Sequence, residues 1–252
     1  MISLENQVAV VTGGSRGIGA AASIILAKAG ASILFTYMQN EGAAKEVQGE
    51  IEALGRKCIT MRANVAKPKN AKKVIEKAMQ KFGQVDILVN NAGIWTYGEM
   101  GKMSEEVWDE TIQTNLNGTF YMINAVVPYM KKRHFGKIIN ISSTAGQRGE
   151  AFHSHYAASK GAIISLTKSL STELGAYNIN VNSVAPGWVD TDLSADVLRN
   201  QKHVEEVRRG IPIGRIPTAD DIAGSILFLA SDLSRHITGE ILNVNGGSVL
   251  VG

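Results

Sequence analysis

The chain alternates between short apolar runs and longer amphipathic stretches. Seven runs of mainly β-branched residues lack polar alternation and predict strands buried on both faces, at 8–11, 33–37, 58–62, 87–90, 138–141, 181–184 and 241–244. Between most of them, apolar residues recur with helical spacing, at 18–29, 43–54, 71–82, 105–130, 157–174 and 219–230. This alternation needs right-handed crossovers, so we expect one doubly wound, Rossmann-type α/β sheet of about seven parallel strands with helices on both faces.

The sequence shows no domain boundary. No repeat, low-complexity segment or linker interrupts the alternation, so residues 1–252 are expected to form a single domain. The polar segment 190–210, between the sixth strand and the last helix, departs from the pattern. Insertions after the carboxyl end of a strand lie over the ligand crevice, so this segment is a candidate substrate lid; an ordinary pair of surface helices is the alternative.

Composition argues against several classes of protein. The chain is 44% hydrophobic but has no run of about 18 apolar residues, so no membrane span is expected. The N-terminus lacks a secretion signal, and the single cysteine, Cys58, cannot form an internal disulfide, so we expect a cytoplasmic protein. The net charge of +3 is spread out, and basic clusters such as 131–133 are too short for a nucleic-acid-binding face.

A glycine-rich segment, TGGSRGIG at 12–19, follows the first strand and opens the first helix. Glycines permit a tight turn and let backbone N–H groups approach a pyrophosphate, which the helix N-terminus also favours. The strand before and the helix after make a dinucleotide-binding loop the better interpretation, and a tight turn without a ligand the weaker one.

The end of the second strand indicates which dinucleotide is bound. An NAD site usually places Asp or Glu there, but the residues at 35–40 are FTYMQN and the first acid is Glu41. Arg16 and Ser15, within the glycine loop, offer guanidinium and hydroxyl donors to a 2′-phosphate. We therefore expect NADP(H) rather than NAD(H), with a plain surface role for Arg16 as the alternative.

Tyr156 and Lys160 open a long predicted helix and share one of its faces. A phenol normally titrates near about 10, and a nearby cation is expected to lower that pKa. Ser143 stands at the end of the fifth strand, where side chains point into the same crevice as the start of the following helix. Ser143 could then hold a substrate oxygen while Tyr156 exchanges its proton.

Together these motifs resemble the short-chain dehydrogenase/reductase family over essentially the whole chain. The resemblance rests on motifs in family order and spacing: 12–19, the NNAG at 90–93, Asn115, Ser143, Tyr156 with Lys160, and Pro186-Gly187. It implies a Ser143–Tyr156–Lys160 site completed by Asn115, whose backbone helps carry a water-mediated proton relay to Lys160. It also implies that Lys160 bonds the nicotinamide ribose.

The resemblance implies a cofactor site as well. Asn90–Gly93 would line the adenosine side and brace the sheet, and Asn64 stands where the family usually has Asp beside the adenine. Val189 and Thr191 would clamp the nicotinamide carboxamide. The expected cofactor-binding residues, with no metal ligand, are Gly13, Ser15, Arg16, Gly17, Ile18, Gly19, Thr36, Tyr37, Asn64, Val65, Asn91, Ala92, Gly93, Tyr156, Lys160, Pro186, Gly187, Val189 and Thr191.

Other polar residues have structural interpretations. Asn115 as an ordinary helix-face amide is the weaker alternative. Ser142 is expected to face away from the site, and Asp86 to cap the turn into the fourth strand. His153 and His155 precede Tyr156, but loop histidines are usually solvated, so we assign them no catalytic role.

The residues expected to line a substrate combine aromatic walls with polar heads, which suits a medium-sized carbonyl compound. They are Trp95, Tyr97, Arg148, Glu150, His153 and Trp188, with Gln147 and Phe152 beside them. The chain looks most like the branch containing 3-oxoacyl-carrier-protein reductases, followed by sugar-alcohol, glucose and hydroxysteroid dehydrogenases.

The resemblance to carrier-protein reductases implies basic residues on two helices beside the cleft. Residues 131–133 could supply one group, but 176–178 carry no charge. A broad ketone or aldehyde reductase therefore fits at least as well. A non-catalytic NADP(H)-sensing protein would tend to lose the serine, tyrosine or lysine, and all three are present.

The last expected strand and the tail, residues 239–252, are apolar. An exposed apolar edge strand invites pairing with another subunit. The resemblance implies a homotetramer with two-fold axes through the long helices and this strand.

Overall fold

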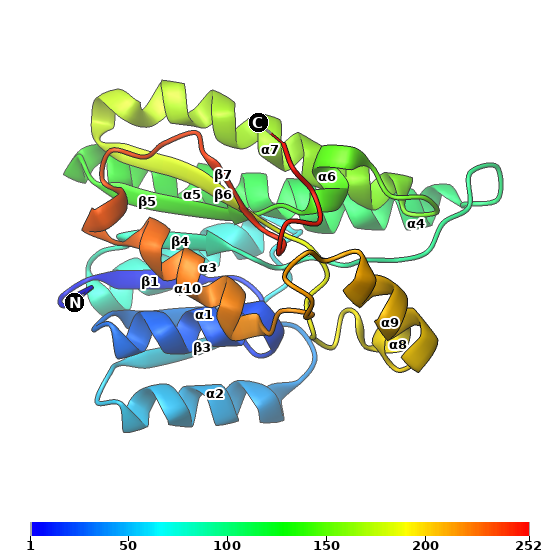
Figure 1. Ribbon diagram of the computed structural model, residues 1–252. Helices are drawn as coiled ribbons and strands as arrows, with labels where there is room; N and C mark the ends of the chain where they lie inside the picture. The colour runs from blue at the N-terminus through cyan, green and yellow to red at the C-terminus, as the bar shows by residue number, and fades with distance from the viewer. Residues whose placement is uncertain (1, 252) are drawn as a thin grey trace.

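The computed structural model describes residues 2–251 and contains one seven-stranded sheet in which every strand is parallel to its neighbours (Figure 1). The strand order is β3-β2-β1-β4-β5-β6-β7. The strands are β1 Val8–Val11, β2 Ser32–Tyr37, β3 Cys58–Arg62, β4 Ile87–Asn90, β5 Gly136–Ile141, β6 Ile179–Pro186 and β7 Ile241–Val244. The structure confirms the predicted fold class and strand positions. The prediction succeeded because a continuous apolar run is typical of a strand that is covered on both faces.

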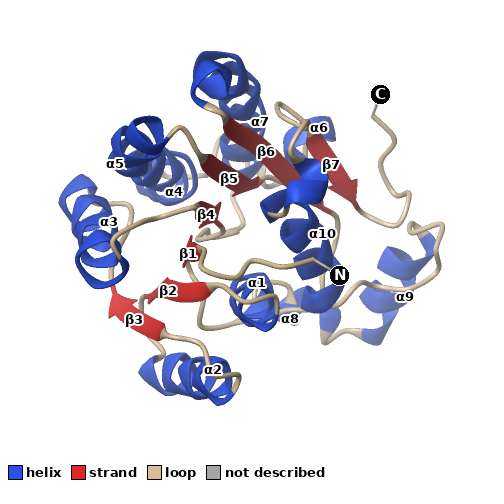
Figure 2. Ribbon diagram, turned by 90° about the vertical axis from the view of Figure 1, so that its left-hand side faces the viewer, coloured by secondary structure: helices blue, strands red, loops and turns tan. Residues whose placement is uncertain are grey.

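Helices cover both faces of this sheet (Figure 2). One face carries α1 Gly17–Lys28, α2 Glu41–Ala53 and α10 Ala219–Ala230; the other carries α3 Pro68–Phe82, α4 Glu105–Thr111, α5 Gly118–Arg133 and α7 Ser154–Leu174. Successive strand residues point to opposite faces, so Val10 and Leu34 join the core under α3 and α5, whereas Val11 and Phe35 join the core under α1.

The strand order reverses beside β1, whose two neighbours are β2 and β4. A doubly wound sheet opens a crevice at such a switch point, beyond the carboxyl ends of the strands. The short helix α6 Thr144–Arg148 begins directly after β5. The fold therefore directs the ends of β1, β4, β5 and β6 toward one region.

The stretch 105–130 is not the single helix that its periodicity predicts. A π-helical turn, Ile112–Asn117, separates α4 from α5. A π-turn shifts the hydrogen-bonding register by one residue and occurs frequently at functional sites. The apolar spacing hides it because one shifted turn hardly changes which positions face the core.

The segment 190–210 forms two short helices, α8 Ala195–Leu198 and α9 Gln201–Arg209, beyond the carboxyl ends of the strands (Figure 1). Neither helix has a fully buried residue.

Two 3₁₀ turns, Gly175–Tyr177 and Asp232–Ser234, complete the elements. Within residues 2–251, no helix is long and apolar enough to cross a membrane.

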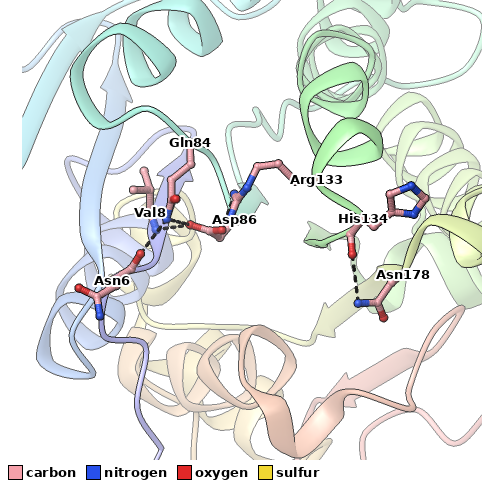
Figure 3. A network of polar contacts seen from close by, with 7 residues as sticks. All are labelled: Asn6, Val8, Gln84, Asp86, Arg133, His134 and Asn178. Atoms are coloured by element: carbon pink, nitrogen blue, oxygen red, sulfur yellow. Dashed lines mark hydrogen bonds and ion pairs between the residues drawn. The ribbon is translucent and has the colours of Figure 1, made fainter.

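Asp86 lies at the other end of the sheet from the crevice, where the strands begin, and connects the elements there (Figure 3). Its buried carboxylate accepts hydrogen bonds from the Val8 backbone N–H at 2.8 Å, the Gln84 amide at 2.8 Å and the Arg133 guanidinium at 2.6 Å. The structural role expected for Asp86 is confirmed: it ties the amino ends of β1 and β4 to the end of α5.

The same network places the basic group 131–133 at the end of the sheet where the strands begin, which we call its amino edge. The sequence interpretation put these residues beside the cleft, and within the protomer that placement is wrong. The reason is the direction in which α5 runs. It connects the carboxyl end of β4 to the amino end of β5, so its last turn lies far from the crevice.

Candidate active site

A cleft of about 130 Å³, partly open to solvent, lies beyond the carboxyl ends of the strands. Its lining includes Ser143 from the end of β5, Tyr156 and Lys160 from α7, and Gly93 from the segment after β4. Residues 186–189, at the end of β6, close another side. The catalytic residues expected from the sequence, Asn115 excepted, therefore share one cavity.

Polar contacts hold the glycine loop in a fixed shape. Its backbone N–H groups at Gly13 and Gly14 donate to the Thr36 hydroxyl and carbonyl, at 3.2 and 2.8 Å. The Asn91 amide donates to the carbonyls of Thr12 and Gly13 at 2.9 and 3.1 Å. Residues 90–93 also brace the sheet, as expected, because the Asn90 amide donates to the Asn140 side chain on β5 at 2.9 Å; their role on the adenosine side stays a prediction. Gly19 tolerates no side chain, because a Cβ there would overlap the Gly13 carbonyl oxygen.

The start of α1 fits a dinucleotide pyrophosphate. Arg16 occupies the N-cap in an extended conformation without a side-chain cap, and the first turn carries no acidic residue. Gly17, at φ +52°, is part-exposed at this end of the helix. The positive end of the helix and its free N–H groups therefore suit an anion. Ser15 and Ile18 flank it, and Ile18 also lines the cleft.

Two groups expected on the adenosine side already have a partner within the protein, namely Asn64 and Arg16. The Asn64 amide oxygen accepts from the Ala66 N–H at 2.9 Å, which leaves it one lone pair for a ligand. Val65 is buried, and Tyr37 is half-buried at the end of β2. Arg16 is exposed but paired, with a guanidinium nitrogen 3.5 Å from an Asp192 carboxylate oxygen.

The segment expected to clamp the nicotinamide is fastened by a serine that the sequence interpretation missed. Ser194 donates to the Val189 carbonyl and accepts from the Thr191 N–H at 3.3 Å. Pro186, Gly187, Val189 and Thr191 all line the cleft. A serine three residues after Thr191 is a common turn signal, and it could have indicated this contact from the sequence.

Ser143, Tyr156 and Lys160 converge in the cleft. The Lys160 ammonium lies 5.7 Å from the centroid of the Tyr156 ring and donates to the Ile141 carbonyl at 2.7 Å. Ser143 Oγ accepts from the Ala145 N–H at 3.1 Å, which orients the hydroxyl and leaves its own proton to donate. Ser142, which was expected to face away, also contributes to the cleft lining, but its hydroxyl donates to the Val184 carbonyl at 3.1 Å.

Burial dominates the electrostatics of this group. Desolvation raises the pKa of Tyr156 to about 12; the Ser143 hydroxyl opposes this shift and the Glu150 charge adds to it. Desolvation also lowers the pKa of Lys160 to about 8. The predicted lowering of the Tyr156 pKa is therefore wrong for the protein without its cofactor. Burial removes both groups from water, and this desolvation outweighs the effect of each group on the other.

Asn115 lies in the π-turn, is fully buried and does not line the cleft. Its amide donates to the Ile94 carbonyl at 2.9 Å and to Ser159 Oγ at 3.1 Å, and its oxygen accepts from the Ile94 N–H at 2.8 Å. Asn115 thus ties the segment after β4 to α7. Ser159, which the sequence interpretation missed, lies within the Tyr156–Lys160 motif, and its helical spacing was the available signal.

Four of the six expected substrate residues line the cleft: Trp95, Arg148, Glu150 and Trp188. The other two lie behind or outside it. Tyr97 is 63% exposed and stacks on Phe152, whereas His153 stacks on Trp95 with ring centroids 4.2 Å apart. Gln147 is likewise outside the lining and donates to Asn243 at 2.7 Å.

His155 is not the solvated loop histidine that the sequence suggested. It lies in the first turn of α7, is fully buried, and its Nε2 is 2.9 Å from the Thr96 hydroxyl. Burial lowers its pKa, so the neutral form is favoured. His155 therefore joins α7 to the segment that carries Trp95.

Known proteins resemble this chain over nearly its full length. The family model described as "Enoyl-(Acyl carrier protein) reductase" matches residues 13–248. The 3-oxoacyl-[acyl-carrier-protein] reductase of Thermotoga maritima is 39% identical over 247 residues, covering 98% of this chain and 99% of that protein. The L-rhamnose 1-dehydrogenase (NAD(P)(+)) of a Sphingomonas strain is 38% identical, covering 97% and 96%.

The fold and these matches agree with a solved structure. A crystal structure of a putative short-chain alcohol dehydrogenase from Sinorhizobium meliloti superposes with a TM-score of 0.94 at 34% identity, covering 98% of this chain and 97% of the other. The sequence motifs that carried the resemblance lie together at one cleft. The chain therefore belongs to the short-chain dehydrogenase/reductase family, in the branch similar to 3-oxoacyl-carrier-protein reductases, and is an oxidoreductase acting on CH–OH and C=O groups.

Proposed function

We propose that this protein is an NADP(H)-dependent carbonyl reductase and secondary-alcohol dehydrogenase, with Tyr156 as general acid and base. The observation that carries the proposal is the convergence of Ser143, Tyr156 and Lys160 in one cleft beside the glycine loop. Two hydroxyl groups at one point suit a substrate oxygen, which accepts hydrogen bonds as a carbonyl and exchanges a proton as an alcohol.

Each residue then has a distinct task. When bound, the nicotinamide supplies or accepts the hydride. Ser143 donates a hydrogen bond to the substrate oxygen, and Tyr156 Oη gives that oxygen a proton during reduction and removes it during oxidation. The Lys160 ammonium stabilises the phenolate that remains.

Asn115 is proposed to support a water-mediated relay to Lys160 through its backbone. Its carbonyl oxygen lies in the π-turn and accepts from the Thr119 hydroxyl at 2.8 Å. We propose that a water bound at this carbonyl connects it to the Lys160 ammonium. The side chain of Asn115 acts as a positioning group, because it holds the segment after β4 against α7.

A panel of ketones, aldehydes and secondary alcohols assayed with NADPH and NADH tests the proposed reaction. The family model and the relatives are named for reduction of different bonds, C=C in one case and C=O in the other. We therefore include a 2-enoyl thioester. Reduction of C=O compounds but not of the enoyl thioester is expected. Turnover of the enoyl thioester alone, or of no compound, would overturn the proposal.

A 3-oxoacyl-carrier-protein reductase is the main alternative, and it is favoured by the names of several relatives at 39% identity. The position of the basic group 131–133 argues against this alternative, because these residues lie at the amino edge of the sheet and not beside the cleft. A sugar dehydrogenase is favoured by the Sphingomonas relative, and a hydroxysteroid dehydrogenase remains a further alternative. A non-catalytic NADP(H) sensor is the remote one, because it has no need of the converging Ser143, Tyr156 and Lys160.

Selectivity for NADP(H) is proposed to depend on Arg16. We expect Arg16→Ala to raise KM for NADPH by about 10-fold or more, the loss expected for one charged hydrogen bond. KM for NADH should change less than twofold. Arg235→Ala, an exposed arginine of the amino edge, serves as the control. Equal effects on both cofactors would contradict the assignment.

We propose that segment 190–210 is a substrate lid on a single domain. Leu193 and Ser194 line the cleft, and the Arg16–Asp192 pair joins the segment to the glycine loop. Saturating NADPH should slow proteolysis within this segment; equal cleavage rates with and without it would exclude a lid coupled to the cofactor.

We propose a homotetramer assembled through the long helices and the last strand, working in the cytoplasm on a small-molecule substrate. β7 is the edge strand of the sheet, and Leu250 beyond it is 88% exposed. Uncovered apolar edges favour pairing. Light scattering after gel filtration should give four times the 27.0 kDa chain mass, and a clean monomer would contradict this assembly.

A further inference from the structure

Glu150 places a carboxylate at the substrate side of the cleft. It follows α6 after Gly149, whose φ is +79°, and it is half-buried in the cleft lining. One of its oxygens accepts a hydrogen bond from the Trp95 indole N–H at 3.3 Å. Within residues 2–251, no Lys, Arg or His nitrogen lies within 4.0 Å of either oxygen.

The Glu150 carboxylate has acceptor sites left for a ligand. Two carboxylate oxygens offer about four acceptor sites, and one weak indole bond occupies only one of them. The charge also lies close enough to Tyr156 to raise the pKa of the phenol. A ligand hydroxyl that enters the cleft can therefore donate to one of the remaining acceptor sites.

The walls beside Glu150 are rigid and aromatic. Trp95 is packed on one face by His153, with centroids 4.2 Å apart and planes 5° apart. Trp188 meets Trp95 edge-on at 5.7 Å. This geometry leaves Trp95 little freedom and holds its N–H against Glu150. The substrate side of the cleft therefore combines an apolar surface with one fixed, charged acceptor.

We propose that Glu150 binds a hydroxyl group of the substrate, so that the protein acts on hydroxylated carbonyl compounds or the matching polyols. The inference rests on the proposed function and deepens it. A substrate hydroxyl would satisfy the free carboxylate oxygen while the carbon skeleton packs on Trp95 and Trp188. An unsubstituted ketone leaves that oxygen desolvated without a donor, and a substrate carboxylate would be repelled. Arg148 reaches the same rim, but it is exposed and its charge is solvated.

Cyclohexanone and its 2-, 3- and 4-hydroxy derivatives test this proposal, because they differ only in the hydroxyl. We would measure kcat/KM with NADPH for the wild type, Glu150→Gln, Glu150→Ala and the control Glu46→Ala, an exposed glutamate on α2. The wild type should prefer at least one hydroxy derivative over cyclohexanone by about 10-fold or more. Glu150→Ala should lower the ratio of kcat/KM for that derivative to kcat/KM for cyclohexanone by about 10-fold or more, whatever its effect on the two values separately.

The remaining variants separate recognition from support of Trp95. Glu150→Gln keeps an acceptor for the indole, so it should retain activity on cyclohexanone and lose part of the hydroxyl preference. Parallel losses on both substrates would assign Glu150 to support of the wall and overturn the proposal. So would a wild type that prefers cyclohexanone. If the wild type reduces no ketone or aldehyde of the wider panel, the proposed function itself fails.

Discussion

Replacing Tyr156 with Phe is expected to lower kcat for carbonyl reduction by about 10²- to 10⁴-fold, the usual contribution of a positioned general acid. The ring keeps its place on the first turn of α7, and the Lys160 bond to the Ile141 carbonyl does not involve the phenol. Only the proton donor is lost. Affinity for NADPH, followed by fluorescence titration, and the melting temperature should stay close to those of the wild type.

Tyr97→Phe is the matched control for this substitution. Tyr97 lies outside the cleft lining and is 63% exposed, so the same atom is removed from the same residue type without touching the site. Its kcat should change by less than twofold. A Tyr156→Phe enzyme that retains more than a tenth of wild-type kcat would remove Tyr156 from the role of general acid.

Replacing Lys160 with Met should abolish turnover yet stabilise the fold. Lys160 is 4% exposed, and burial lowers its pKa from 10.5 to about 8. At about 1.36 kcal/mol per pKa unit, holding the charged form costs roughly 3 kcal/mol at neutral pH. Loss of the charged hydrogen bond to the Ile141 carbonyl offsets about 2 kcal/mol of this, so a net gain of about 1 kcal/mol in the free energy of unfolding is expected at pH 7.

The pH dependence of this gain identifies its cause. Below about pH 8, Lys160 is protonated in both the folded and the unfolded protein, and the whole penalty is present. Between about 8 and 10.5 the folded protein loses the proton first, the unfolded chain binds more protons, and wild-type stability rises relative to the variant. The stability difference between variant and wild type should therefore shrink between pH 7 and pH 10.

Urea unfolding of both proteins at pH 7 and pH 10 measures this difference. Lys168→Met, at an exposed position of the same helix, controls for the change of residue type and should shift stability by less than about 0.5 kcal/mol at either pH. A Lys160→Met variant that is less stable than the wild type at pH 7, or whose gain is equal at both pH values, would contradict the desolvation argument.

Much of the fold was predictable because its signals are local. The strands at 8–11 and 58–62 were placed with their observed bounds, since a continuous apolar run marks a strand that is covered on both faces. The glycine loop and the one-face spacing of Tyr156 and Lys160 are also local, because turn and helix geometry depend on neighbours in the chain. The π-turn escaped prediction because it hardly alters the apolar spacing.

The sequence by itself thus determined the class of sheet, the order of its elements and the residue types available for chemistry. Only the tertiary structure decided how each of those side chains is placed and charged. It brings Arg16 to Asp192, 176 residues away, and Glu150 to Trp95, 55 residues away. It also desolvates Tyr156 and Lys160, which raises the pKa of Tyr156, against the expectation from its pairing, and lowers the pKa of Lys160. The physical reason is that periodicity follows from local backbone geometry, whereas burial and charge depend on segments that meet only in the folded chain.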